Sequence, residues 1–368
     1  MRRLTSVTLV TLSTLLAACG SDTTDPSGPG PLWGPAPPTA VSGATSIDFA
    51  LSLARPAEVT YSVYGSAQSL TAAELREDAA GTGGRTPVTA GSTALTAGTA
   101  RHFTLDSLAP GGTLFIYLAA APRAGDPDAP DSTTVYTVSR TLYPLQPAAS
   151  IASTSLNTTI GYYWYAPESY YKDTSSAVPL LIFLHGSGEK GNGTTELSRV
   201  KVHGPPKLID QGRELPFLVI SPQLPSSSGG WPAGLVKELI DSARVRFRVD
   251  TTRIYVTGLS MGGYGSWYFA AAYPDIPAAV VPIAGAGPNG SACTMKDVPV
   301  WAFHGDADGT VNMSGSVSMV AAINACSPGP SVVPKLTIYP GVGHDSWTRT
   351  YDGSAGHDIY TWMLGYHR

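Results

Sequence analysis

One run of residues constrains the fold of this chain more than any other. In 253–265, RIYVTGLSMGGYG, a short apolar stretch leads into Gly258, Ser260 and Gly262 and then into a helical pattern. Residues 254–256 predict a buried parallel strand, and residues 267–272 predict a packed helix. A G-x-S-x-G sequence between a strand and a helix is the pattern of a nucleophile elbow, whose sharp turn holds the serine in a strained conformation between two glycines. An ordinary strand-to-helix turn is the alternative, and the flanking patterns favour the elbow.

Around this turn, residues 148–368 alternate between strand-like and helical patterns. We expect strands at 159–166, 179–184, 217–221, 278–284, 300–304 and 335–339, a helix at 235–247 and a closing helix at 354–364. Such alternation predicts a mostly parallel sheet with helices on both faces. With the elbow in the middle, this is the order of an α/β hydrolase.

An apolar strand also ends in His185 and Gly186, where the glycine-rich loop of LHGSGEKG begins. In hydrolases of this fold, the loop at this place donates a backbone N–H group to the oxyanion of the reaction. By position we assign the N–H of Ser187, together with that of Met261 directly after the elbow serine. A plain turn is the alternative for this loop. His185 precedes the serine, so we interpret it as a structural residue.

Two more loops supply the acid and the base. In WAFHGDADGTV, the carboxylates of Asp306 and Asp308 follow a strand, and similar esterases use the second to orient the histidine, so we choose Asp308 and expect Asp306 to fix the loop. The order Ser, Asp, His leaves three histidines after Asp308. His344 follows a strand end on a glycine loop, whereas His357 lies in the closing helix pattern and His367 at the terminus.

These residue types predict covalent catalysis without a metal or a cofactor. A serine hydroxyl becomes nucleophilic when a neutral imidazole takes its proton and a carboxylate fixes the tautomer of that imidazole. Ser260, His344 and Asp308 would form this triad. The histidine, aspartate and glutamate residues show no spacing typical of a metal site.

Residues 150–368 resemble the dienelactone hydrolase-like and phospholipase/carboxylesterase branch of the α/β hydrolases. The resemblance rests on HGSGEKG, on HGPPK at 203–207 and on HDSW at 344–347. This branch includes feruloyl and acetylxylan esterases and polyhydroxybutyrate depolymerases, so the resemblance implies a carboxylic ester as substrate. Trp231 and Trp347 are candidates to stack on a sugar or an aromatic acyl group, although packing is the commoner role of such residues.

The N-terminal 19 residues carry Arg2 and Arg3, a short apolar stretch and the ending LAAC. This is the pattern of a signal peptide, and LAAC resembles the bacterial lipobox, in which the cysteine, here Cys19, carries the lipid. The alternative is an ordinary secreted protein in which Cys19 has no role in lipid attachment. The resemblance implies an exported lipoprotein held by its lipid at a membrane, at the outer membrane or the cell surface.

Residues 20–40 are rich in Pro, Gly, Ser and Thr and predict an extended tether. From 41 to 147, short strand-like runs at 46–53, 58–64, 101–105, 113–120 and 134–142 predict a small β-sandwich, with a brief helix at 74–80. The stretch 103–118 resembles part of a fibronectin type III-like or immunoglobulin-like module. Nothing in this region suggests chemistry, so a spacer or a binding module is our interpretation.

Cysteine usage and charge complete the prediction. Apart from Cys19 the chain has only Cys293 and Cys326, which can pair in an oxidising compartment or remain two buried thiols. Charged residues make up 14% of the chain and the net charge is -4, without a basic cluster, which argues against nucleic acid as a partner.

A serine carboxylesterase, acting on carbohydrate-linked, aromatic or polymeric esters, is the leading hypothesis. A serine peptidase of the same fold and a non-catalytic surface-binding lipoprotein are the alternatives, and the sequence leaves the oligomeric state open.

Overall fold

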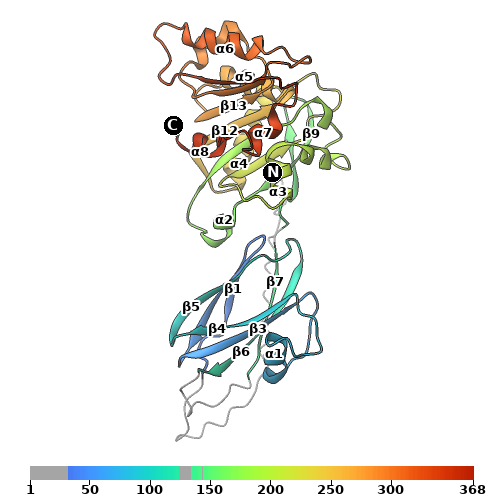
Figure 1. Ribbon diagram of the computed structural model, residues 1–368, viewed down its shortest axis with the longest axis vertical. Coiled ribbons are helices and arrows are strands. Elements are labelled where there is room, and N and C mark those ends of the chain that lie inside the picture. Colours follow the sequence, from blue (N-terminus) through green and yellow to red (C-terminus); the bar gives the residue numbers. More distant parts are fainter. Residues whose placement is uncertain (1–31, 124–133, 143) are drawn as a thin grey trace, which may run out of the picture. The chain divides into compact units, whose positions relative to one another are not determined.

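The computed structural model describes residues 32–123, 134–142 and 144–368. The predicted signal peptide and Cys19 lie outside the described residues. The chain divides into two compact units, Met1–Pro144 and Leu145–Arg368 (Figure 1). Within the described ranges, every helix is too short or too polar to cross a lipid bilayer.

Two antiparallel sheets form the N-terminal unit. One contains β1 (Thr39–Ser42), β2 (Ile47–Leu53) and β5 (Gly98–Leu105), in the order β1-β2-β5. The other has the order β4-β3-β6-β7 and contains β4 (Thr89–Leu95), β3 (Ala57–Tyr64), β6 (Thr113–Pro122) and β7 (Tyr136–Thr141). Both sheets contribute to one core, with Phe49 from β2, Val63 from β3 and Ile116 from β6 all fully buried. The predicted all-β sandwich is therefore present.

The tether expected at 20–40 ends earlier than the sequence predicted. Leu32 and Trp33 are buried in the core of the N-terminal unit, and Trp33 packs edge-on against Tyr136 at 4.9 Å between ring centroids. The backbone of Trp33 pairs with Leu53 in an isolated bridge. The composition of this segment, which is rich in Pro and Gly, did not predict the burial. Two apolar side chains are nevertheless enough to anchor it to the core.

The expected helix of this unit is α1 (Ala72–Ala79), which begins with a capping box between Thr71 and Glu74. Two of its carboxylates are paired: the Tyr64 hydroxyl donates to Asp78, and Arg85 forms ion pairs with Asp78 and Glu74.

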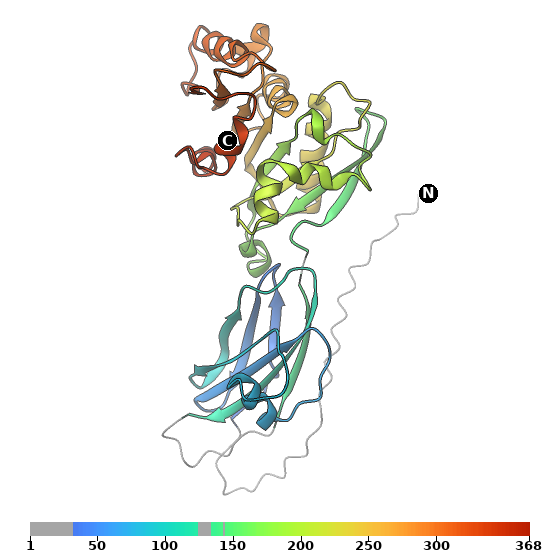
Figure 2. The same cartoon turned by 45° about the vertical axis from the view of Figure 1, so that its right-hand side comes forward.

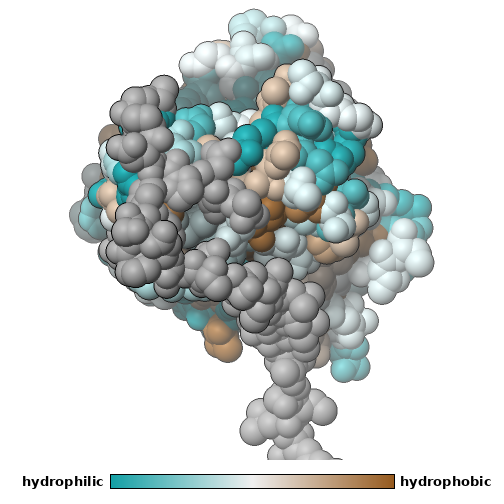
Figure 3. Space-filling model, turned by 90° about the horizontal axis from the view of Figure 1, so that it is seen from below, coloured by the Kyte–Doolittle hydropathy of each residue, from teal (hydrophilic) through white to brown (hydrophobic). Residues whose placement is uncertain are grey.

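The face of the molecule seen from below in Figure 3 mixes hydrophilic and apolar residues.

The C-terminal unit is built on one sheet of eight strands, in the order β15-β14-β13-β12-β10-β11-β9-β8. The strands are β8 (Ala148–Ser153), β9 (Thr158–Tyr165), β10 (Val178–Leu184), β11 (Leu218–Pro222), β12 (Val249–Leu259), β13 (Ala279–Ile283), β14 (Trp301–Gly305) and β15 (Lys335–Tyr339). From β11 to β15 all neighbours are parallel, while β9 pairs antiparallel with both β8 and β11. The parallel strands consequently end at one edge of the sheet.

Helices cover both faces of this sheet (Figures 1 and 2). One face packs against α4 (Ala233–Arg246), α5 (Met261–Ala272), η3 (Asn289–Met295) and α6 (Ser314–Asn324), and the other against α3 (Gly204–Asp210), α7 (Trp347–Tyr351) and α8 (Ile359–Leu364). Shorter segments are α2 (Glu168–Lys172), η1 (Ser187–Glu189) and η2 (Leu197–Val202). Along β10, Ile182 faces the first core and Phe183 the second, so the strand is apolar on both sides. The predicted α/β-hydrolase fold is confirmed.

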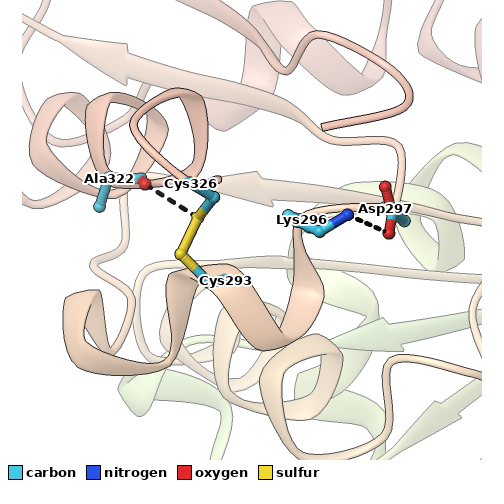
Figure 4. Close-up of a disulfide and its surroundings, with 5 residues drawn as sticks. All are labelled: Cys293, Lys296, Asp297, Ala322 and Cys326. Atoms are coloured by element: carbon cyan, nitrogen blue, oxygen red, sulfur yellow. Dashed lines mark hydrogen bonds and ion pairs between the residues drawn. A yellow bond between two sulfur atoms is a disulfide. The ribbon is translucent and has the colours of Figure 1, made fainter. Parts of the chain in front are cut away.

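A disulfide joins Cys293 in η3 to Cys326, which follows α6 (Figure 4). The bridge closes a stretch of 33 residues that contains β14, its carboxyl-end loop and all of α6. It therefore fixes the two ends of the segment that carries Asp308.

Candidate active site

The elbow serine occupies a backbone conformation that its neighbours enforce. Ser260 lies between the end of β12 and the start of α5, with φ 51° and ψ -116°. A Cβ atom on Gly258 would lie 2.3 Å from the Gly262 carbonyl oxygen, and one on Gly262 would lie 1.8 Å from the Leu184 carbonyl oxygen. Only glycine fits at both places, so the turn brings α5 directly onto β10 and presents Ser260 at the carboxyl edge of the sheet.

His344 joins the serine to a carboxylate. Its Nε2 atom lies 2.9 Å from the Ser260 Oγ atom, and its Nδ1 atom lies 2.7 Å from Oδ2 of Asp308. The three residues come from loops that follow β12, β14 and β15, which meet at the same edge of the sheet. The structure thus brings together the three side chains that the sequence singled out.

The Asp308 carboxylate is buried and ionised. Burial alone would raise the pKa of Asp308, but hydrogen bonds from His344 and from the N–H groups of Val311 and Thr310 lower it below its usual range. An ionised carboxylate only accepts hydrogen bonds, so the His344 Nδ1 atom carries the proton. The Nε2 lone pair of His344 then faces the Ser260 hydroxyl and can accept its proton.

The alternative candidates for the acid and the base have other contacts or none in the site. Asp306 does not contact the histidine; its Oδ1 atom accepts from the N–H of Gly341 at 2.6 Å, which ties the loop of β14 to the loop that carries His344. His357 packs edge-on against Trp301, at 5.5 Å between ring centroids. His367 is exposed near the terminus. Asp306 therefore fixes the loop, as expected.

Behind Asp308 lies a second histidine that the sequence analysis missed. The fully buried His304 has its Nδ1 atom 2.8 Å from Ser316 Oγ and its Nε2 atom 2.9 Å from the Val311 carbonyl oxygen and 3.3 Å from Asp308 Oδ2. Ser316 Oγ in turn donates to the Gly285 carbonyl oxygen. The Asp308 carboxylate is consequently held between two imidazoles. The only sequence signal was the apolar strand that precedes His304, which predicts burial.

His185 is a structural residue, as the sequence indicated. Its ring is fully buried, with Nδ1 2.5 Å from the Gly186 carbonyl oxygen and Nε2 accepting from the Leu224 N–H at 3.0 Å. Burial lowers the pKa of His185 to about 4. The neutral ring fixes the loop that begins at Gly186, where a Cβ atom would lie 2.8 Å from the Leu259 side chain.

A cavity of about 650 Å³ opens beside the serine. Its lining includes Ser187 and Met261, the two residues to which we assigned the oxyanion N–H groups. Trp231 forms one wall, is 6% exposed and donates from Nε1 to the His185 carbonyl oxygen at 3.0 Å. The other lining residues are Lys190, Gly229, Gly230, Pro232, Ser260, Tyr264, Gly265 and Tyr268. The volume lies in the range of pockets that enclose most of a drug-sized organic ligand.

Trp347 has a different position from Trp231. It is 9% exposed and lies edge-on to the His344 ring, at 5.0 Å between centroids, with His203 on another side at 5.6 Å. It is not among the residues that line the cavity beside Ser260. Trp347 therefore packs behind the histidine, while Trp231 is the one of the two that a ligand in this cavity would touch.

Comparisons with known proteins agree with this architecture. Residues 233–360 match the Dienelactone hydrolase family. A bifunctional acetylxylan esterase/xylanase, XynS20E of Neocallimastix patriciarum, is 24% identical over 54% of this chain and 27% of its own length. Poly(3-hydroxyalkanoate) depolymerase C of Paucimonas lemoignei is 42% identical over 60 residues, which are 16% of this chain and 14% of the depolymerase. The matched part therefore spans about a quarter or less of either relative.

Among solved structures, a thermostable esterase has the same fold. The two structures superpose with a TM-score of 0.51 at 20% identity, and the alignment covers 90% of this chain and 99% of the esterase. Because the C-terminal unit begins at Leu145, an alignment of this extent also includes part of the N-terminal unit.

Proposed function

We propose that this chain is a serine carboxylesterase, which hydrolyses a carboxylic ester through an acyl-enzyme. The observation that carries this proposal is the continuous hydrogen-bond chain from Ser260 through His344 to Asp308 at the carboxyl edge of an α/β-hydrolase sheet. The matches to the Dienelactone hydrolase family and to an acetylxylan esterase support a hydrolase that acts on ester bonds.

Each step of the proposed reaction has a residue to which it can be assigned. The Ser260 hydroxyl gives its proton to His344 Nε2 as its oxygen attacks the ester carbonyl, and the imidazolium is stabilised by Asp308. The oxyanion accepts hydrogen bonds from the N–H groups of Ser187 and Met261. His344 then protonates the departing alcohol. A water molecule repeats the sequence on the acyl-enzyme and releases the acid and free Ser260.

The substrate class is proposed from the cavity and the relatives together. The aromatic wall beside Ser260 can stack on a sugar or an aromatic ring, and the two curated relatives are named for acetylated xylan and a polyester. We therefore propose carbohydrate-linked, aromatic or polyester substrates. The alternative of a serine peptidase is an outcome of the test below, since the same triad cleaves amides.

The test is hydrolysis of short p-nitrophenyl acyl esters and methyl ferulate by the chain from residue 20 onward, which retains every described residue. Ser260→Ala should abolish the hydrolysis of these esters. Ser198→Ala, at an exposed serine of η2, should leave the rate of hydrolysis unchanged. A fluorophosphonate should add its mass to the peptide that contains Ser260 and to no other. Cleavage of p-nitroanilides but not of esters would replace the esterase by a peptidase, and activity that survives in Ser260→Ala would refute the triad.

We further propose that the protein is exported and anchored by lipid on Cys19. The lipobox-like LAAC supports this, and the Cys293–Cys326 disulfide fits an oxidising compartment. Mass spectrometry of the N-terminal peptide from membranes should find an acylated Cys19 as the first residue. A soluble mature protein with an unmodified N-terminal peptide would contradict the anchor.

A further inference from the structure

The cavity beside Ser260 is lined by three aromatic residues and one cationic residue. Tyr264 and Tyr268 lie four residues apart on α5, so they project from the same helix face, and they are 37% and 49% exposed. With Trp231 they form an aromatic wall. Lys190 is the single charged residue among the described residues that line this cavity.

The Lys190 ammonium group is incompletely used by the protein. Its Nζ atom donates to the Ser228 carbonyl oxygen at 3.2 Å, and an ammonium group has three hydrogens to donate. Within the described part of the chain, no carboxylate forms an ion pair with Lys190. The adjacent Glu189 carboxylate lies instead toward His203 and His185, at 3.9 and 4.0 Å. Lys190 therefore has hydrogens available for a ligand.

The cavity is also open beside this group. Gly229 and Gly230 line it, and a Cβ atom built on either residue would meet nothing within 4 Å. Side chains at these positions would project into that open space. A substituent on the substrate can consequently reach the region of Lys190 without displacing protein atoms.

We propose that Lys190 forms an anion-binding subsite and that the preferred esters carry a carboxylate on their sugar or aromatic ring. The proposal rests on the function proposed above and names its substrate class more narrowly. The ring stacks on the aromatic wall, and the carboxylate accepts hydrogen bonds from the Lys190 ammonium group. Because the chain as a whole is acidic, with a net charge of -4, this attraction is local to the subsite and does not come from the overall charge.

The size of the effect follows from the chemistry of the contact. A hydrogen bond to a charged group in a half-buried site corresponds to a preference of roughly 10- to 100-fold over a neutral partner of the same shape. Lys190 is half-buried, so salt should weaken this preference without removing it.

The test compares esters that differ only in charge. The first pair is monomethyl terephthalate and its neutral isostere methyl 4-carbamoylbenzoate, and the second is 4-carboxyphenyl acetate and 4-carbamoylphenyl acetate, so the charge is placed once on the acyl side and once on the alcohol side. The ratio of kcat/KM for the charged ester to that for the neutral ester is measured in each pair. Lys190→Gln, which can still donate to Ser228, should lower this ratio at least tenfold in one pair. Lys190→Arg should retain it.

Lys237→Met, at a lysine on α4 that pairs with Asp241, is the matched control for a lost surface charge and should leave the ratio unchanged. A ratio that is the same in wild type and Lys190→Gln for both pairs overturns the proposal, even if both rates fall together. In that case Lys190 would act on the oxyanion or on the loop.

Equilibrium binding separates this proposal from the proposed function. In at least one of the two pairs, the Ser260→Ala protein should bind the charged ester at least fivefold more tightly than its carbamoyl isostere, and Lys190→Gln in that background should remove the difference. If wild type cleaves none of the four esters but this difference is found, the esterase fails and the subsite stands. Equal binding of the charged and the neutral ester in both pairs overturns the subsite whatever the activity.

Discussion

His185 should make the C-terminal unit sensitive to acid. Its Nδ1 atom faces a carbonyl oxygen and its Nε2 atom faces the Leu224 N–H, so the folded protein accommodates only the neutral ring with the proton on Nδ1. A second proton would bring two N–H groups into opposition inside the core. Protonation of His185 therefore requires that the loop of the proposed oxyanion hole be opened.

The magnitude follows from linkage between protonation and folding. Burial lowers the pKa of His185 from 6.5 to about 4 in the folded protein. Above pH 6.5 neither state binds the proton, so the residue has no effect on stability there. Between pH 6.5 and 4 the unfolded chain binds it and the folded protein does not, so stability falls as the pH falls, by about 3 kcal/mol in total.

The assay is urea unfolding between pH 7.5 and 4, followed by tryptophan fluorescence. Of seven tryptophans only Trp33 lies in the N-terminal unit, so the signal reports mainly on the C-terminal unit. His185→Gln can still accept from the Leu224 N–H but does not titrate, so between pH 6.5 and 4 it should lose about 3 kcal/mol less than wild type. Other acid-sensitive groups are common to both proteins, and His367→Gln, at an exposed histidine, should behave as wild type.

An equal loss of stability in wild type and His185→Gln over this range would refute the reasoning. If the variant does not fold, the imidazole NMR signal of His185 in wild type answers the same question. It should not titrate above pH 5, and a midpoint near 6.5 would show that the buried ring accepts a proton without opening the loop.

Three further predictions follow from the packing and the triad. Asp308→Asn should lower kcat for ester hydrolysis by about 10³- to 10⁴-fold, because the amide no longer holds His344 in the tautomer that the proposed mechanism requires; a loss below tenfold would contradict the proposed role of Asp308. Gly262→Ala should prevent stable folding, since its Cβ atom would lie 1.8 Å from a backbone oxygen of β10, whereas thermal unfolding of Gly290→Ala, where a Cβ atom meets nothing within 4 Å, should resemble that of wild type. Replacing Cys293 and Cys326 by serine should cost about 4 kcal/mol for a closed stretch of 33 residues and lower Tm by about 10 °C; calorimetry that finds no change would exclude a stabilising role for the disulfide.

The central parallel strands β10, β11 and β13 were predictable because each is an apolar run that is buried on both faces. The strands β10, β11, β13, β14 and β15 lie within a few residues of the expected ranges. The sequence did not predict β8 (AASIAS) or β4 (TAGSTAL), whose small residues form a ladder only because an adjacent strand supplies the partner. Pairing with the adjacent strand, and not the local sequence, therefore determines that β4 and β8 form.

At the C-terminus the boundaries differ for a local reason. A closing helix was expected from residue 354, but α8 begins at Ile359 after the N-cap Asp358, whose side chain accepts from the N–H groups of Tyr360 and Thr361. Gly353 and Gly356 have positive φ values of 77° and 78°, which end the preceding helical segment. The short α7 was missed because its residues WTRTY favour strands. Its first turn is stabilised by Asp345, which accepts from the Thr348 N–H.

The candidate triad was predictable because strand order and glycine-rich turns are encoded locally, whereas the surroundings of Asp308 and of the cavity are not. His304 touches Asp308 across four residues, but its other contact, Ser316, lies twelve residues away on α6. Nothing in the sequence pattern marks that serine as a hydrogen-bond partner. It becomes one when α6 packs onto the sheet.

The cavity shows why the predicted chemistry and the predicted substrate depend on different residues. Ser187 and Lys190 lie three residues apart on the loop after β10, yet their proposed roles use different parts of the chain. The proposed oxyanion contact uses only the backbone N–H of Ser187, a group that every residue except proline has, so it does not depend on the kind of ester. The proposed selection among esters uses the side chain of Lys190, which can be exchanged without a change in the turn that places Ser187. A loop of this kind keeps the oxyanion site while its specificity varies, so this fold can retain one reaction while its substrates change.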